Sequence, residues 1–297
     1  GFFLNGMIGR DAIVSNAYGM GTWLSSPDFG VDLTQAYLQL GFGPSFFIDA
    51  GKFTTLNGAE VIAPISDTNF GRSILFGFAG PFTATGARAT WQANEKLKLI
   101  AGLNDGWDTI RDWSRGVTAE LNATYIFNPV FTLGLTGYSG QQRAVDRTDV
   151  GPTSNRTLID VLATFTLTPK LSVLVNYDYA WQRIAGLPDD TLGRANWNGV
   201  AAYLNYAWTD AWRTSLRGEF FNDEDGYRTG VAQKWKEVTF TVAYVPQNNK
   251  NLEIRGETRR DFSNVASFSD KSRNGFLSDG SRNYNQSFAL EVFYKFG

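Results

Sequence analysis

The chain has 297 residues with no Cys and no His, and its formal net charge is −2. The two missing residue types exclude disulfides, thiolate and imidazole metal sites, and the Ser-His or Cys-His pairs of most hydrolases. The nearly balanced charge offers no basic face for nucleic acid, and no apolar run reaches the roughly 18 residues of a transmembrane helix. We therefore expect no nucleic-acid partner.

Apolar and polar residues alternate with a period of two along most of the chain, which is typical of strands with one apolar face. In the stretch 170–182, for example, Val173 and Val175 fall on the apolar face, whereas Asn176 and Asp178 fall on the other. The alternation predicts fourteen strands, over residues 1–10, 32–42, 46–55, 82–93, 96–104, 115–127, 130–139, 156–167, 170–182, 196–208, 211–221, 234–245, 251–261 and 284–296.

The connections between these strands alternate between short and long. Tight-turn pairs such as Asn94-Glu95 and Thr168-Pro169 alternate with longer segments at 11–31, 56–81, 105–114, 140–155, 183–195, 222–233 and 262–283. Short periplasmic turns and long extracellular loops are typical of outer-membrane barrels, and an even strand number returns both termini to the periplasm. The sequence thus predicts a transmembrane antiparallel up-and-down β-barrel of about fourteen strands, as a single domain over residues 1–297.

Aromatic residues gather near the predicted strand ends, where amphipathic rings prefer to lie at a membrane interface. The alternative is a set of scattered surface aromatics. We expect one ring at the periplasmic interface, formed by Trp91, Tyr125, Phe127, Tyr206, Trp208, Trp212, Tyr244, Tyr294 and Phe296. We expect a second ring at the outer interface, formed by Trp107, Trp181, Trp197, Phe220 and Trp235.

The segment 56–81 is long and unusually apolar for a loop, with Ile74, Leu75, Phe76 and Phe78 close together. A loop exposed to water has little reason to contain such residues. We predict that this segment folds into the lumen and narrows it, with Glu60, Asp67 and Arg72 at the constriction. The alternative is an extracellular loop that packs over the rim of the barrel.

Charged residues on the polar faces of the strands are predicted to line the lumen. Fourteen strands enclose a lumen too wide for side chains alone to fill, whereas eight already suffice for a filled one. The alternative is an ion-paired interior without conductance. Because the two signs are nearly balanced, we expect weak ion selectivity. The predicted pore-lining residues are Arg88, Lys96, Lys98, Glu120, Asp160, Asp178, Arg213, Arg217, Glu219, Arg255, Glu257 and Arg259.

Specific pieces of the first third of the chain resemble the OmpL-like outer-membrane β-barrel porins. These pieces are Ala36-Tyr37, Gly51-Lys52-Phe53, Gly58-Ala59-Glu60-Val61, Arg72-Ser73, Pro81-Phe82, Thr85-Gly86 and Asn104-Asp105-Gly106-Trp107. The resemblance implies passive transport, no catalytic residues and a further strand pair before Gly1, which would make sixteen strands. The stretch Phe288–Phe296 is similar to the C-terminal strand that the barrel-assembly machinery reads, although a Gly follows Phe296.

Two acidic segments faintly suggest calcium loops, namely Asp105–Asp108 and Asn222–Gly226. Neither has the full spacing with a terminal Glu, so we interpret both as ordinary turns and expect no metal and no cofactor.

The leading hypothesis is an outer-membrane porin that passes small polar solutes or ions and contacts lipid and lipopolysaccharide. A homo-oligomer is compatible with it. The first rival is a non-conducting barrel that acts as a scaffold or sheath for a partner protein, which co-purified haem would reveal. A barrel enzyme and a soluble all-β protein are the remaining rivals. No constellation of catalytic residues supports the enzyme.

Overall fold

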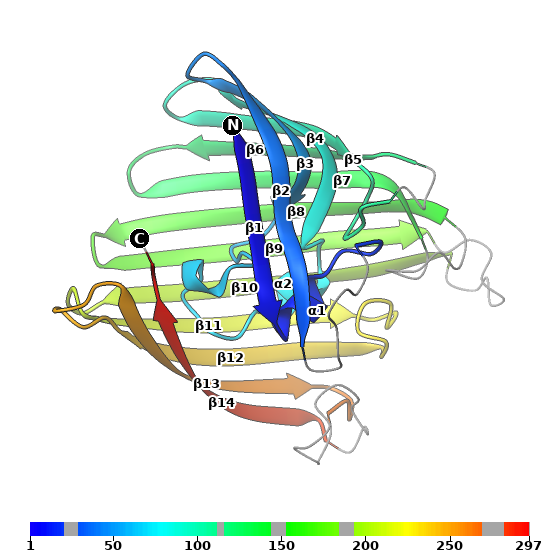
Figure 1. Ribbon diagram of the computed structural model, residues 1–297. Helices are drawn as coiled ribbons and strands as arrows, with labels where there is room; N and C mark the ends of the chain where they lie inside the picture. Colours follow the sequence, from blue (N-terminus) through cyan, green and yellow to red (C-terminus); the bar gives the residue numbers. More distant parts are fainter. Residues whose placement is uncertain (21–28, 112–115, 144–152, 184–192, 269–281, 297) are drawn as a thin grey trace.

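The computed structural model describes residues 1–20, 29–111, 116–143, 153–183, 193–268 and 282–296. It contains fourteen antiparallel strands, each hydrogen-bonded to the next one along the chain, in the order β1 to β14 (Figure 1). This order confirms the predicted up-and-down barrel. The strands are β1 (Phe2–Gly9), β2 (Gly30–Phe42), β3 (Phe46–Thr54), β4 (Thr83–Gln92), β5 (Leu97–Asn104), β6 (Thr118–Ile126), β7 (Phe131–Arg143), β8 (Thr153–Thr168), β9 (Leu171–Arg183), β10 (Arg194–Ala207), β11 (Trp212–Asp223), β12 (Gln233–Tyr244), β13 (Leu252–Ser263) and β14 (Tyr284–Tyr294).

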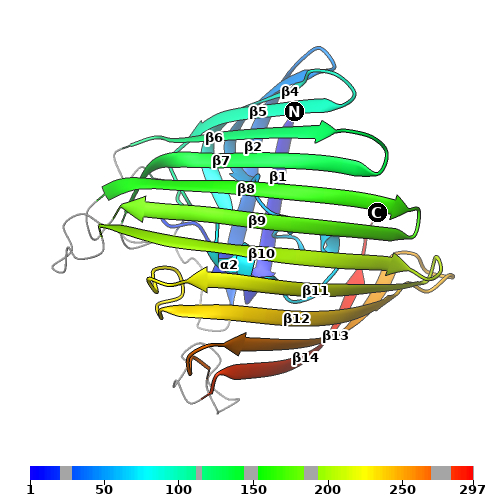
Figure 2. The same ribbon diagram turned by 180° about the vertical axis from the view of Figure 1, so that it is seen from behind.

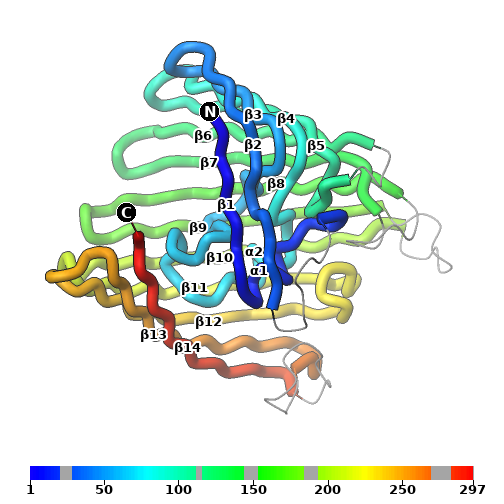
Figure 3. The backbone as a smooth tube through the Cα atoms, in the orientation of Figure 1, coloured from blue at the N-terminus to red at the C-terminus, as the bar shows by residue number. Residues whose placement is uncertain are grey.

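Short turns and long connections alternate, so the barrel has a short-turn end and a long-loop end. Both termini lie toward the short-turn end (Figure 3). There the Gly1 amino group donates to the Gln39 carbonyl, and the Lys295 N–H donates to the Asn251 carbonyl. Parts of the predicted long connections 11–31, 105–114, 140–155, 183–195 and 262–283 lie outside the described residues.

The two faces of the strands differ as the alternation predicts. On β12 the polar residues Gln233, Glu237 and Thr239 are buried, whereas Val238 and Phe240 are 52% and 43% exposed. Successive side chains of a strand point to opposite faces, so the polar face lines the inside of the barrel and the apolar face points outward. An outward apolar band is what a barrel wall needs in contact with lipid.

In the described parts of the connections there are three short helices: α1 (Asp11–Ser15), the 3-10 helix η1 (Pro64–Ser66) and α2 (Ile74–Phe78). The Ser73 side chain caps α2 by accepting a hydrogen bond from the Phe76 N–H at 2.9 Å. Figures 1 and 2, which view the barrel from opposite sides, both place α2 between the near and the far wall. Among the described residues, none of these helices has the length and apolar character required to cross a membrane.

The hydrophobic core lies inside the barrel, around α2. Ile74 and Leu75 pack there with apolar residues of the wall, namely Tyr138 of β7, Leu158 of β8, Ala180 of β9, Trp197, Ala201 and Tyr203 of β10 and Phe221 of β11. A short helix is marginal in water, so this packing rather than helix propensity stabilises α2.

Gly51 and Gly86 form a cross-strand pair where β3 and β4 flank the long connection between them. A Cβ on Gly51 would collide with the Ala36 carbonyl, and one on Gly86 with the Leu103 carbonyl. Gly51 also has a φ of 139°. The strands β2 to β5 therefore approach each other closely here, which only Gly permits.

The two predicted aromatic rings have different outcomes. At the short-turn end Trp91, Trp208, Trp212 and Tyr294 are each 47–58% exposed on the outer surface, in agreement with the prediction. At the long-loop end the prediction is wrong for Trp107, Trp197 and Trp235. Trp107 and Trp197 are 7% and 0% exposed, and all three belong to or pack against the core inside the barrel.

Candidate functional site

The candidate site is formed by the connection between β3 and β4, residues 56–81, where it meets the inner wall. Ile74, Leu75 and Ala79 belong to the core beside β7 to β11. Ile62 and Phe76 pack in a second cluster with Phe82 and with Met7 of β1. The apolar residues that distinguish this segment in the sequence thus contact opposite sides of the barrel.

Carboxylates of the wall hold the backbone of the segment by accepting its N–H groups. The Glu219 oxygens accept the Ile74 and Leu75 N–H groups at 2.8 and 3.0 Å. The Glu257 oxygens accept the Phe70 and Gly71 N–H groups at 2.7 and 2.8 Å. A buried N–H without a partner is costly, so these carboxylates stabilise a segment that has few backbone hydrogen bonds of its own.

Further wall residues reach the backbone carbonyls of the segment. The Arg217 guanidinium donates to the Gly71 carbonyl at 2.6 Å, and the Trp197 indole donates to the Ala79 carbonyl at 2.9 Å. Arg255 donates to the Pro64 carbonyl at 3.1 Å, and Arg259 donates to the Arg72 carbonyl. Strands β10 to β13 therefore hold the segment on one side along most of its length.

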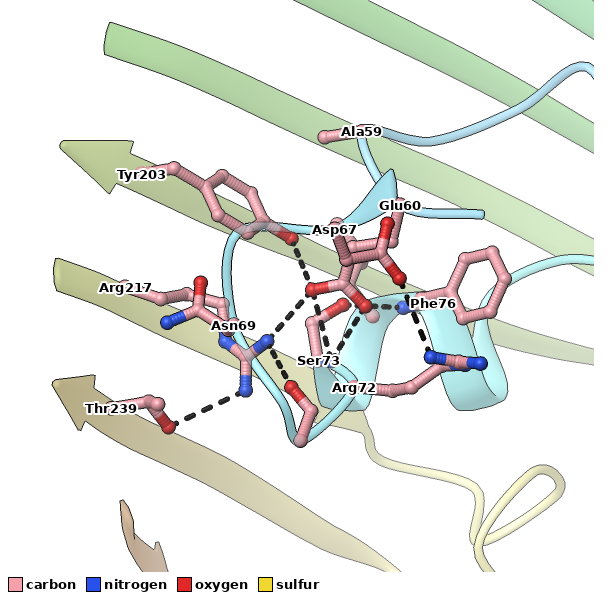
Figure 4. A network of polar contacts seen from close by, with 12 residues as sticks. Ala59, Glu60, Asp67, Asn69, Arg72, Ser73, Phe76, Tyr203, Arg217 and Thr239 are labelled. Carbon is pink, nitrogen blue, oxygen red and sulfur yellow. Dashed lines mark hydrogen bonds and ion pairs between the residues drawn. The ribbon is translucent and has the colours of Figure 1, made fainter. Parts of the chain in front are cut away.

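Glu60 is the centre of the most buried ion-pair network (Figure 4). Its carboxylate lies 2.7 Å from the Arg217 Nη1 and accepts the Tyr203 hydroxyl at 2.9 Å. It also accepts the Ser73 N–H at 2.9 Å, while Arg217 makes a second pair with Glu237 at 2.9 Å. Removing one member of such a buried network costs about 3–5 kcal/mol, because it leaves an uncompensated charge. Glu60 is therefore a structural anchor of the segment.

Asp67 and Arg72 form the second ion pair of the segment, with 3.3 Å between their side chains. Arg72 also donates to the Ile62 carbonyl, and its Nη2 lies 3.8 Å from the carboxylate of Asp11, the first residue of α1. Burial raises the pKa of Asp67 to about 7, against the opposing effects of the Val61 N–H and the Arg72 guanidinium. The Asp67 carboxylate therefore changes its charge close to neutral pH.

Three cavities meet the segment from its two sides. A long-loop cavity of about 1030 Å³ is lined by Arg72, Phe78, Trp107, Arg228, Trp235 and Phe268. At the other end, a short-turn cavity of about 310 Å³ is lined by residues that include Asp67, Lys170, Arg213, Glu253 and Arg255. A second short-turn cavity of about 340 Å³ is lined by residues that include Leu56, Glu60, Lys98, Asn122 and Asp160. Arg72 thus lines the cavity on one side of the segment, and its partner Asp67 lines a cavity on the other.

Most of the predicted pore-lining charges lie on the inner face, but they are buried. Arg88 pairs with Glu120 at 2.6 Å, and Asp160 and Asp178 are directly opposite each other across β8 and β9. Arg217, Glu219, Arg255, Glu257 and Arg259 hold the segment 56–81, as described above. Arg213 and Lys98 line the short-turn cavities, whereas Lys96 is exposed in the turn before β5. Asp160, Arg255 and Arg259 line the cavities as well, so about half of the predicted set borders open space.

Two residues of the site were not singled out from the sequence. Tyr227 stacks on Trp197 at 5.7 Å, and the Arg228 guanidinium lies 5.7 Å from the Trp107 ring. Both belong to the β11–β12 turn, where Asp223 accepts the N–H groups of residues 227, 228 and 229. In the run Asn222–Gly226, Asp223 orders the turn through these hydrogen bonds, and it is the sequence signal that could have indicated an ordered loop. In the part of the chain that the structure describes, no group of three or more acidic side chains is placed to hold a metal ion.

The comparisons with known proteins agree with this architecture. The family model described as "Putative beta-barrel porin-2, OmpL-like" matches residues 1–296. No curated protein matches the chain in sequence.

Solved structures with a similar fold are outer-membrane proteins. A loop L8 deletion mutant of OmpT of Vibrio cholerae is 15% identical, with a TM-score of 0.63 over 90% of this chain and 80% of that one. The anion-selective porin of Comamonas acidovorans is 10% identical, with a TM-score of 0.63 over 90% and 79%. A trimer form of the Vibrio cholerae OmpT is 14% identical, with a TM-score of 0.62 over 89% and 81%.

Proposed function

The chain belongs to the family "Putative beta-barrel porin-2, OmpL-like", and we propose that the segment 56–81 forms the constriction of its pore. As a member of this family the protein is an outer-membrane porin through which small polar solutes or ions diffuse passively. It is a channel and performs no catalysis. The long-loop end faces the outside and the short-turn end faces the periplasm, as in other outer-membrane barrels.

The observation that carries the proposal is the position of the Arg72–Asp67 pair between cavities on opposite sides of the segment. The Arg72 side chain keeps 20% of its surface exposed, whereas the Arg217 side chain keeps none. Charges in a narrow and partly desolvated passage act on a permeating ion much more strongly than charges at a wide mouth. Arg72 and Asp67 therefore set the ion selectivity, whereas Glu60 holds the segment in place.

Substitution of the pair tests this proposal in planar bilayers. Arg72→Glu should shift the reversal potential in a KCl gradient toward cations, and Asp67→Asn should shift it toward anions. Unit charges about 4 Å apart interact by about 1 kcal/mol in water, which corresponds to a roughly fivefold change in the permeability ratio. The matched control is Asp210→Asn in the exposed β10–β11 turn, which changes the charge equally and should leave selectivity unchanged.

Two results would contradict the proposal in different ways. If Asp67→Asn and Asp210→Asn changed the ion selectivity equally, the constriction would have to lie elsewhere than at the Arg72–Asp67 pair. A folded barrel without any single-channel conductance would favour the non-conducting scaffold, for which the many buried ion pairs of the interior are also suited.

The apolar outer surface of the barrel supports proposals for its partners. Phe288, Leu290 and Val292 of β14 point outward and are 61–80% exposed, and Phe296 is 91% exposed. This apolar ladder supports binding of the barrel-assembly machinery to Phe288–Phe296, and the outward band as a whole contacts lipid and lipopolysaccharide. A homo-oligomer is compatible with the trimer form known for a protein of similar fold.

A further inference from the structure

The long-loop cavity has a composition that passive diffusion alone does not require. Its volume of about 1030 Å³ would accommodate a small organic solute, and aromatic rings line much of it. A passage for ions needs polar walls, whereas rings offer flat apolar surfaces on which another ring can stack.

Three of the rings that line the cavity contact one another in a row. Trp235 of β12 packs edge-on against Phe78 of the segment 56–81, with ring centroids 5.5 Å apart. On its other side Trp235 stacks on Phe268 at 5.8 Å, with only 13° between the ring planes. The three rings come from three separate parts of the chain, so their alignment results from the tertiary structure.

Three guanidinium groups line the same cavity. Arg228 lies 5.7 Å from the Trp107 ring and 5.4 Å from the Trp197 ring, and its Nε donates to the Phe78 carbonyl at 2.6 Å. Arg72 and Arg259 also line the cavity, together with two carboxylates, those of Asp108 and Asp261. The lining therefore has one more cationic side chain than anionic ones.

The two carboxylates of the cavity are already engaged. Asp108 accepts the Phe82 and Thr83 N–H groups, both at 2.9 Å. Asp261 pairs with Arg259 at 2.7 Å. Both carboxylates therefore already have partners in the protein, the Asp261 pair also engages Arg259, and the excess of one guanidinium in the lining favours an anion.

The turn that presents Arg228 is held in place before any ligand binds. The buried Asp223 carboxylate accepts the N–H groups of Tyr227, Arg228 and Thr229 at 2.9, 3.0 and 2.7 Å. A preformed turn loses little conformational entropy on binding, which favours affinity.

From this arrangement we propose that the long-loop cavity is a binding site for small carboxylates that carry a ring. The ring of the solute stacks on the row of rings formed by Phe78, Trp235 and Phe268, and its carboxylate faces the guanidinium group of Arg228. Guanidinium groups bind carboxylates by charge-assisted hydrogen bonds. The inference rests on the proposed pore, because it assigns a solute class that is captured before it reaches the constriction.

Block of single-channel current tests the inference with four probes: benzoate, galacturonate, acetate and glucose, added at the long-loop side. Benzoate should block at a concentration at least tenfold lower than acetate, which lacks a ring, and glucose, which lacks the charge. Galacturonate carries a carboxylate on a sugar ring, whereas benzoate carries one on an aromatic ring, so the two probes distinguish these two kinds of solute. Block by benzoate and galacturonate assigns the site to ring carboxylates in general, and block by benzoate alone restricts it to aromatic ones.

Variants assign the block to the cavity. Arg228→Gln should raise the half-blocking concentration of benzoate about tenfold, the loss of one charge-assisted contact. Phe268→Leu keeps an apolar side chain but removes a ring, and should raise it severalfold. The control is Arg194→Gln on the outer face of β10, where Arg194 lies 4.7 Å over the Trp181 ring in a similar cation–π contact. This control should leave the block unchanged.

Equal block by benzoate and acetate would overturn the inference, as would a benzoate block that neither Arg228→Gln nor Phe268→Leu weakens. If Arg228→Gln fails to fold, as judged by the heat-dependent gel mobility of the barrel, Phe268→Leu decides alone. These results do not bear on the proposed constriction, which is tested separately by the reversal potential of the Arg72 and Asp67 variants without any organic solute.

Discussion

Charged residues inside this barrel serve two purposes that the amino-acid type alone does not distinguish. Glu60 and Arg217 are buried in a network that includes Tyr203 and Ser73, and they hold the chain. Asp67 and Arg72 form a simpler pair that borders cavities on two sides. The Glu60 and Asp67 side chains are similarly buried, with 5% and 6% of their surface exposed, so the number of partners rather than burial or charge distinguishes the anchor from the proposed selectivity residue.

The raised pKa of Asp67 predicts a selectivity that depends on pH. Burial raises this pKa to about 7, so the carboxylate is charged at pH 8 and neutral at pH 6. At pH 8 its charge offsets that of Arg72, and at pH 6 the Arg72 charge is uncompensated. Lowering the pH from 8 to 6 should therefore shift the reversal potential toward anions.

Asp67→Asn is the control for this pH effect. The amide is neutral at every pH, so the variant should resemble the wild type at pH 6 and should lose most of the shift between pH 6 and pH 8. A variant that keeps the full shift would assign the titration to another group.

The β3–β4 segment is an element without a regular backbone ladder, and side chains of the wall replace that ladder. Glu219 and Glu257 each accept two consecutive N–H groups from it, and its apolar residues pack toward both sides of the barrel. Because few of its hydrogen bonds are local, the position of the segment depends on strands far away in sequence.

Substitution of Glu219 should destabilise the position of the segment 56–81 more than it destabilises the strands of the barrel. Glu219→Ala leaves the Ile74 and Leu75 N–H groups without their acceptor, and an unsatisfied buried group costs about 1–3 kcal/mol. The expected result is a noisier open-channel current, because the segment samples other positions. Glu219→Gln keeps one acceptor oxygen and should have a smaller effect. Equal noise in the wild type and in Glu219→Ala would show that packing alone holds the segment.

At the scale of the whole molecule, the barrel has two ends of different character. The long-loop end presents a large cavity lined with rings, and the short-turn end presents two smaller cavities. A solute that moves through the pore therefore meets the ring-lined cavity on one side of the segment 56–81 only.

The orientation of these ends can be checked by labelling on intact cells, because the chain has no Cys of its own. Glu224→Cys in the β11–β12 turn is exposed at the long-loop end and should react with a membrane-impermeant thiol reagent. Asp210→Cys is exposed at the short-turn end and should react only after the cells are opened. The opposite labelling would reverse the orientation.

The sequence by itself determined the wall of this protein. The period-two alternation, the alternation of short and long connections and the even strand number predicted the fourteen antiparallel strands, because all three are local properties of the chain. The apolar run Ile74–Phe78 also marked the segment 56–81 as unusual before any contact was known.

Only the tertiary structure decided what lies inside the wall. Glu60 meets Arg217, 157 residues away, and Trp197 meets Ala79, 118 residues away. Alternate residues of a strand face opposite sides, and the sequence does not say which side is outside. The position of Trp197 near a strand end is therefore equally consistent with the aromatic residues at the outer membrane interface and with the core inside the barrel. Which charges are paired, and which border open space, depends on the path of the segment 56–81 inside the wall, because each partner is chosen in space and not along the chain.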